Sequence, residues 1–158
     1  MKTTRYTRKG IFKMKVLVQR VKKASVVIQD ETVGEINKGF LLYVCFEAND
    51  TMEKLDKAVT KILNLRIFED SKAKMNQNII DVKGEILSVS QFTLSWDGKK
   101  GHRPSFDKSM SPNEAKIFYR TFNDKLSEKC YLKKGLFGAE MQVYSQNDGP
   151  VTFFLDFD

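Results

Sequence analysis

Hydrophobic and polar positions along the first third of the chain follow the two-residue period of β-strands. Extended patterns cover 16–19 and 25–28, and a turn at 30–31 leads to a further one at 32–36. The run 40–46 is apolar throughout, which predicts a strand that is buried on both faces.

Two later stretches have the period of amphipathic helices. In the first, Asp50 is expected to cap the helix and Glu53 to complete a capping box. In the second, Ser111 is the expected cap, Pro112 the first helical residue and Glu114 the partner in the box. The apolar stripes predict core packing and consist of Met52, Leu55, Val59, Ile62 and Leu63 in the first helix and Ala115, Phe118, Phe122 and Leu126 in the second.

Further strands are expected at 85–94, between the helices, and at 139–144 and 151–157, after the second helix. Strands that recur around two helices indicate an α/β fold, with mixed β-sheets and the two main helices packed on one side. The 158 residues contain no internal repeat or low-complexity tract, so we expect a single domain with a substantial core.

Charge is distributed unevenly along the chain. The net charge is +7, but residues 1–13 hold five basic residues and no acidic one. The other 22 basic and 20 acidic residues leave 14–158 close to neutral, so only local clusters favour nucleic-acid binding. We expect 1–13 to be a basic leader, either disordered or an upstream start, and 14–158 to be the folded domain. A targeting or RNA-contacting arm is the alternative for the leader.

The residue types argue against several common kinds of active site. The single histidine, His102, lies in a loop, and no Cys-x-x-Cys or His-Glu-x-x-His spacing indicates a zinc site. We therefore expect neither a metal nor a cofactor. Cys45 and Cys130 give no disulfide framework, and no apolar run is long enough to cross a membrane. We expect buried free thiols and a cytoplasmic protein.

The first candidate site is the end of the strand expected at 85–94, where the sequence reads Ser90-Gln91-Phe92-Thr93. Thr93 is a candidate nucleophile, but no neighbouring base is evident to activate its hydroxyl. At a strand tip the backbone N–H groups of Phe92 and Thr93 are free to bind a developing oxyanion, and Gln91 can orient the ester or the donors. This stretch therefore predicts acyl-transfer chemistry that relies on backbone groups.

The second candidate site is Asn147-Asp148-Gly149-Pro150-Val151-Thr152, just before the last expected strand. Taken alone, the Gly-Pro pair is typical of a simple turn. Glycine also accepts backbone angles that are closed to other residues, and an X-Pro bond can be cis at modest cost. The residues by themselves leave both interpretations open.

Together, in this order, the two stretches resemble the D-aminoacyl-tRNA deacylase family. Four further segments are similar to the family in register, namely Gln19-Arg20-Val21, Arg66-Ile67-Phe68, Lys74-Met75-Asn76 and Arg103-Pro104-Ser105-Phe106. The resemblance runs from Met14 to the C-terminus and does not include the leader. It implies the fold of these deacylases, and it implies that the 2′-hydroxyl of the terminal tRNA ribose assists the reaction, with the protein acting mainly by positioning.

The same resemblance implies that Gly149 and Pro150 form a cis pair, which enters the active site of a partner subunit in a homodimer. The rigid backbone of the pair leaves no room for the side chain of an L-amino acid. D-aminoacyl-tRNA and glycyl-tRNA, including glycine mischarged on tRNA(Ala), are then the implied substrates. Arg20 is expected to brace the pair through its planar guanidinium, and Asn147 is expected to belong to the same substrate-selecting site.

Lys99, Lys100, His102 and Arg103 share one loop next to the first candidate site. They are expected to contact phosphates at the acceptor end of the tRNA, because such contacts give affinity without sequence preference. The 3′-terminal adenosine is expected to bind nearby, where Trp96 or Phe106 could stack on its base. The resemblance thus implies a homodimeric hydrolase of D-aminoacyl-tRNA. The alternatives are a non-enzymatic RNA-binding module on the same fold and an esterase that uses Thr93 as its nucleophile.

Overall fold

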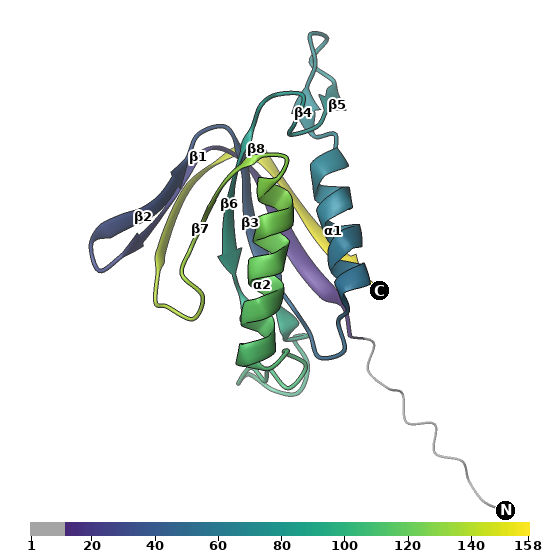
Figure 1. Cartoon of the computed structure of the whole chain (residues 1–158), viewed down its shortest axis with the longest axis vertical. Helices are drawn as coiled ribbons and strands as arrows, with labels where there is room; N and C mark the ends of the chain where they lie inside the picture. The colour runs from purple at the N-terminus through teal and green to yellow at the C-terminus, as the bar shows by residue number, and fades with distance from the viewer. Residues whose placement is uncertain (1–11) are drawn as a thin grey trace, which may run out of the picture.

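The computed structural model describes residues 12–158, so nearly all of the expected leader lies outside the described residues. Figure 1 shows a sheet with two long helices beside it. The elements are β1 (Met14–Ile28), β2 (Glu31–Ile36), β3 (Gly39–Cys45), α1 (Met52–Asn64), β4 (Phe68–Glu69), β5 (Met75–Gln77), β6 (Glu85–Ser90), the 3-10 helix η1 (Phe92–Ser95), α2 (Pro112–Ser127), β7 (Tyr131–Lys134) and β8 (Gln142–Phe157).

Strand β1 organises the main sheet, whose order is β2-β1-β3-β6-β7 with β8 also paired to β1. Along one edge, β1 pairs antiparallel with β3 over its first half and with β2 over its second. Along the other edge it pairs antiparallel with β8 over almost its whole length. The pairs β3–β6 and β6–β7 are parallel, and each parallel connection contains a helix.

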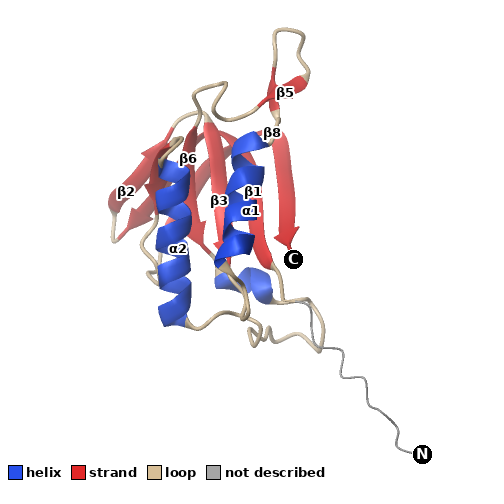
Figure 2. Ribbon diagram, turned by 45° about the vertical axis from the view of Figure 1, so that its right-hand side comes forward, coloured by secondary structure: helices blue, strands red, loops and turns tan. Residues whose placement is uncertain are grey.

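Both helices cover the same face of the sheet (Figure 2). Two successive crossovers of the same hand, stepping in the same direction across a sheet, place their helices on one side. The expected mixed sheet with two helices on one side is therefore confirmed. The short strands β4 and β5 form a separate hairpin beyond the end of α1.

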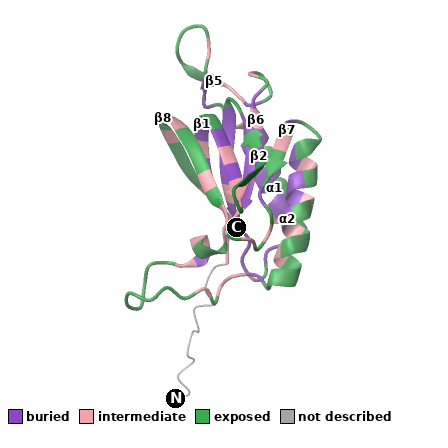
Figure 3. Ribbon diagram, turned by 90° about the vertical axis from the view of Figure 1, so that its left-hand side faces the viewer, coloured by how far each residue is buried: buried purple, intermediate pink, exposed green. Residues whose placement is uncertain are grey.

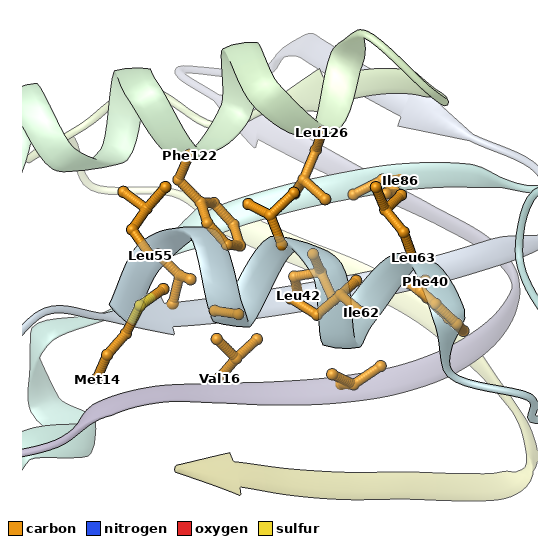
Figure 4. Close-up of a cluster of buried hydrophobic side chains, with 14 of the residues drawn as sticks. Met14, Val16, Phe40, Leu42, Leu55, Ile62, Leu63, Ile86, Phe122 and Leu126 are labelled. Atoms are coloured by element: carbon orange, nitrogen blue, oxygen red, sulfur yellow. The ribbon is translucent and has the colours of Figure 1, made fainter. Parts of the chain in front are cut away.

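The larger core lies between the helices and the sheet (Figure 4). Strands β1 and β3 contribute Val16, Phe40 and Leu42, and α2 contributes Phe122 and Leu126. The curled sheet encloses a second, smaller core on its other face, and this core consists of Val21, Ala24, Val26, Ile36, Leu41, Leu87 and Val89. Figure 3 shows the burial of β1 and β6 at the centre of the sheet and the exposure of β8 along much of its length.

The predicted cap of the first helix is wrong by one residue. Thr51 is the N-cap of α1, and its side chain accepts the N–H of Lys54 at 3.3 Å. Asp50 is buried instead, where its carboxylate accepts the N–H of Glu47 at 2.7 Å and lies 3.2 Å from the Lys54 ammonium. The carboxylate that was expected to cap the helix therefore binds a backbone N–H of the loop before it.

The second helix begins as expected, with Ser111 at the cap and Pro112 in the first turn. Ser111 Oγ hydrogen-bonds the Glu114 carboxylate at 2.9 Å rather than a backbone N–H, so the predicted box is only partly formed. The buried face of α2 also includes Tyr119, whose hydroxyl donates to Ser88 O of β6 at 2.8 Å. Ala115 and Phe118 of the expected stripe are only partly buried.

Several strands differ from the prediction. The strand expected at 85–94 ends at Ser90, where the chain turns into η1 because its parallel partner β3 ends at Cys45. Strand β7 was missed, since its four residues show no clear alternation of polar and apolar positions. The strands expected at 139–144 and 151–157 are one continuous β8, because β1 runs beside both segments.

A buried carboxylate fixes the start of β1. Glu47 is fully buried, accepts the backbone N–H of Lys13 at 2.8 Å and forms an ion pair with Lys15. The side chain of Lys13 also lies 2.8 Å from the carboxylate of Asp158, at the end of β8. Lys13, the last residue of the expected leader, thus contacts the domain.

Replacement of Phe122 by alanine is expected to lower the free energy of unfolding by about 3–5 kcal/mol, because the ring is fully buried between α2 and the sheet. Ile117 lies on the same helix but is half exposed, so Ile117→Ala should cost well under half as much. Chemical denaturation of both variants measures the difference. Equal losses would contradict the assignment of the core.

Candidate active site

The turn η1 presents unpaired backbone donors at the end of β6. The N–H of Gln91 still pairs with Val44 O at 2.7 Å, which continues the ladder of the sheet. The 3-10 bonds that follow start with Leu94 N–H, which donates to Gln91 O at 3.4 Å. The first N–H groups of a helical turn have no partner within that turn. Those of Phe92 and Thr93 also donate to no acceptor elsewhere among residues 12–158.

Side chains from two further segments contact the carbonyl oxygen of Phe92 in this turn. Cys45, at the end of β3, has its sulfur 3.6 Å from Phe92 O, and Ser109 Oγ lies 3.4 Å from the same oxygen. Burial, reinforced by the negative charge of Glu47, raises the pKa of the Cys45 thiol to about 12, so the thiol remains protonated at neutral pH. Cys45 and Cys130 are both buried free thiols, as expected.

Aromatic packing holds the outer side of the turn. The ring of Phe92 is 55% exposed and meets the ring of Phe106 edge-on, with centroids 4.9 Å apart. Phe106 belongs to the segment 103–106, which lies in the loop between η1 and α2. Thr93 is exposed, and its hydroxyl hydrogen-bonds no basic side chain in the described part of the chain. The geometry thus offers backbone donors rather than an activated nucleophile.

The second candidate site lies where β8 bends beside β1. The Gly149–Pro150 peptide bond is cis, and Gly149 has a φ of +114°, which favours glycine strongly. A Cβ at Gly149 would lie 2.8 Å from Val151 Cγ2 and 3.0 Å from Arg20 Nη2. The absence of a side chain at this position therefore lets the loop and the guanidinium pack directly together.

Arg20 connects this loop to the segment after α1. Its Nη1 donates to Ile67 O at 2.6 Å, and its Nε lies 3.2 Å from Asp148 Oδ2. The latter contact is an ion pair, because the Nε–H is not aligned as a hydrogen bond. Arg20 is almost completely buried, so its fixed charge and planar geometry restrain Asp148 and the backbone on either side.

Asn147 closes the base of the same loop. Its amide nitrogen donates to Arg20 O at 2.9 Å and to Val151 O at 3.1 Å, which occupies both of its protons. Its amide oxygen accepts from the hydroxyl of Thr152 at 3.3 Å. The side chain therefore braces the loop and has no free donor for a ligand.

The two candidate sites lie at opposite ends of the sheet within one chain. Arg20 pairs with Phe40 near the start of β3, whereas Val44, at the other end of β3, pairs with Ser90. Four residues of strand separate these positions by about 13 Å. Ile67, which anchors Arg20, is also separated from the η1 end of the sheet by the length of α1.

The basic loop follows η1 directly. Lys99, Lys100, His102 and Arg103 are all exposed there. Asp97 shapes the start of the loop by accepting the N–H of Lys99 at 3.0 Å. These side chains are therefore free to contact a ligand that is bound at η1.

Among residues 12–158, no group of three or more histidine, cysteine, aspartate or glutamate side chains is placed to hold a metal ion. No helix in the described chain is long and apolar enough to cross a membrane.

Several residues of these sites were not predicted. Cys45 and Ser109 contact η1 from other segments, and nothing in the local sequence indicates contacts across 47 or 17 residues. Asp148 lies within the Asn-Asp-Gly-Pro motif, so its place in the sequence could have indicated a role in this loop. The Ile67 carbonyl is a backbone group, whose role no residue type reveals.

Comparison with known proteins gives one family and two similar structures. The model of the family described as D-Tyr-tRNA(Tyr) deacylase matches residues 17–156. A solved structure described as c-Myc DNA unwinding element binding protein is 42% identical, with a TM-score of 0.86, over 89% of this chain and 97% of that chain. Another, described as a probable eukaryotic D-amino acid tRNA deacylase, has a TM-score of 0.79 over 91% of this chain and 99% of that chain. At 19% identity, this second structure supports the fold alone.

Arg20→Met keeps the apolar stem but removes the donors to Ile67 O and the charge beside Asp148. We expect the free energy of unfolding to fall by about 2–3 kcal/mol and amide hydrogen exchange to accelerate at 148–151. Lys22→Met is the matched control, because Lys22 is exposed on the same strand. Unchanged exchange at 148–151 would show that Arg20 does not hold the loop.

Proposed function

Because this chain belongs to the D-Tyr-tRNA(Tyr) deacylase family, and is therefore a hydrolase of aminoacyl-tRNA esters, we propose that it cleaves D-aminoacyl-tRNA into free D-amino acid and tRNA. The observation that carries the proposal for the site is the pair of unpaired N–H groups of Phe92 and Thr93 on η1. Such donors stabilise the oxyanion that forms when the ester carbonyl is attacked.

In the proposed reaction, water attacks the ester carbonyl and the C–O bond to the terminal ribose breaks. The donors of η1 bind the negative oxygen, and Gln91 orients the ester or the donors. The neighbouring 2′-hydroxyl of the ribose assists by proton transfer, since no basic side chain is positioned beside Thr93. The protein contributes mainly by holding the reacting groups in the productive geometry.

The separation of the two sites favours a homodimer. The α-carbon of the amino acid is bonded directly to the ester carbonyl carbon, so the chiral filter and the oxyanion donors must lie a few Å apart. Within one chain, Arg20 of β1 and Ser90 of β6 pair with opposite ends of β3. We therefore propose that Gly149 and Pro150 of one subunit complete the site at η1 of its partner.

Selection in this proposal occurs by exclusion. The loop 147–151 is braced by Arg20 and Asn147, so it cannot retreat from a bulky group without the loss of several contacts. An L-amino acid would direct its side chain at this backbone, whereas a D-amino acid would direct its side chain away. Glycine has no side chain, so we include glycyl-tRNA, such as glycine on tRNA(Ala), among the substrates.

The exposed residues Lys99, Lys100, His102 and Arg103 are proposed to contact phosphates at the acceptor end of the tRNA, near its terminal adenosine. Phosphate contacts of this kind are independent of sequence, which suits an enzyme that accepts many tRNAs. We propose that the reaction takes place in the cytoplasm and needs neither a metal nor a cofactor.

A nucleic-acid-binding module is the second candidate, because the 42%-identical structure is described as a DNA-unwinding-element binding protein. Residues 14–158 are close to neutral, which gives little general attraction for DNA. The donors of η1 and the braced Gly-Pro loop would have no purpose in simple backbone binding. We therefore retain the deacylase as the proposed function.

The first test is the hydrolysis of matched D-aminoacyl-, L-aminoacyl- and glycyl-tRNA by the purified protein with a chelator present. The D and glycyl esters should be lost and the L ester spared. Equal loss of all three would indicate an unselective esterase. The absence of any loss, with tRNA still bound, would favour the binding module.

Thr93→Ala is expected to keep kcat within about tenfold of the wild type, because the backbone N–H donors remain. If Thr93 is the nucleophile, the same change would reduce kcat by about 10⁴-fold or more, and an acyl-enzyme could be trapped in the wild type. Thr60→Ala, at an exposed position of α1, is the matched control.

Gly149→Ala is expected to reduce both activity and discrimination against the L ester, because the added Cβ displaces Arg20 Nη2 or Val151. Gly138→Ala is the matched control for backbone strain, since Gly138 has a φ of +76° but a Cβ added there would meet no atom within 4 Å. Full activity and full selectivity in Gly149→Ala would contradict the exclusion model.

Mixed dimers test the contribution of the partner subunit. A dimer that pairs a Gly149→Ala chain with a Gln91→Ala chain contains one site with an intact turn and an intact Gly-Pro loop if the sites are shared. Activity should then reappear on mixing two impaired variants, to about a quarter to a half of the wild-type level. A monomeric active enzyme, or no recovery on mixing, would overturn the shared site.

A further inference from the structure

The carbonyl of Phe92 is held from inside the protein by two side chains from different segments. Cys45 lies at the end of β3 and Ser109 in the loop before α2, 47 and 17 residues away in the chain. Both have a donor directed at the same oxygen, at 3.6 and 3.4 Å. The turn is thus anchored through one backbone atom.

One arrangement of the hydroxyl protons satisfies both serines of this cluster. Ser95 Oγ and Ser109 Oγ are 2.8 Å apart, and each hydroxyl has a single proton. When Ser109 donates to Phe92 O, the buried Ser95 donates to Ser109. The thiol of Cys45 has two carbonyl oxygens within reach, Phe46 O and Phe92 O. Phe92 O is the nearer of its two carbonyl partners, at 3.6 Å against 3.8 Å for Phe46 O.

Planarity transmits this anchoring to the other side of the peptide. In a trans peptide unit the C=O and N–H bonds point in opposite directions within one plane. A Phe92 carbonyl that is held inward by Cys45 and Ser109 therefore directs the N–H of Thr93 outward. We propose that Cys45 and Ser109 are positioning residues, which aim the Thr93 N–H at the reacting ester oxygen. This inference rests on the proposed function.

These side-chain contacts add to the backbone bonds of the turn, in which Leu94 N–H donates to Gln91 O and Trp96 N–H donates to Thr93 O. The Phe92 side chain is mostly exposed and packs mainly against Phe106. Hydrogen bonds weaken steeply once the angle at the hydrogen falls toward 120°, so a freely rotating peptide plane would be a poor oxyanion donor. A preorganised donor, by contrast, has no reorganisation cost during the reaction.

The kinetic test uses full-length Cys45→Ala and Ser109→Ala with D-aminoacyl-tRNA as substrate. Each variant should reduce kcat by about tenfold with KM unchanged, because the donor acts only in the transition state. Cys130→Ala and Ser127→Ala are matched controls, because Cys130 is the other buried thiol and Ser127 an exposed serine near the end of α2. Both controls should retain wild-type kcat.

Conservative variants separate positioning from simple packing. Cys45→Ser and Ser109→Thr keep a donor and should recover most of the lost kcat. Ser109 is only half buried, so Ser109→Ala should remain folded even if Cys45→Ala does not. A rise in KM alone, or unchanged kcat in both alanine variants, would overturn the inference.

Nuclear magnetic resonance of the Thr93 amide provides a readout that does not depend on the substrate. Its chemical shift and hydrogen-exchange rate should change in both alanine variants and remain unchanged in Cys130→Ala and Ser127→Ala. If the wild type hydrolyses no aminoacyl-tRNA, the proposed function fails, whereas the amide signal still tests the orientation. An unchanged Thr93 signal in both alanine variants would overturn the inference in either case.

Discussion

The pairing of β1 with three other strands is the constraint on which the rest of the structure depends. This strand carries β3 and β2 along one edge and β8 along the other, so every strand of the main sheet is placed directly or indirectly by it. Glu47 fixes its start through Lys13 and Lys15, and Arg20 lies near its middle. The two candidate sites are therefore held at fixed positions relative to each other.

That arrangement separates the two parts of the proposed active site within one chain. The proposed oxyanion donors lie beside one end of β3, and the braced Gly-Pro loop lies beside the other. Two groups that act on adjacent atoms of a substrate cannot be separated by a strand length. In the proposed homodimer, a second copy of the chain removes this conflict, because a two-fold axis repeats both halves and can bring unlike halves together.

Both candidate sites depend on backbone geometry more than on reactive side chains. Around η1 the important groups are N–H donors, and around Gly149 they are a peptide bond and a position without a Cβ. Side chains such as Arg20, Asn147 and Cys45 contribute by holding that backbone. This arrangement is suited to a reaction in which the substrate supplies a hydroxyl and the protein supplies position and exclusion.

The local sequence determined the two helices, most of the strands and the two motifs, because periodicity and glycine or proline chemistry are local properties. Only the tertiary structure decided which residues lie next to the ends of the helices and strands. Asp50 accepts the N–H of Glu47 instead of capping α1, and β6 ends at Ser90 because its partner β3 ends beside it. It also placed Cys45 and Ser109 under the Phe92 carbonyl, a contact that no spacing reveals, because packing brings together residues that are distant in the chain.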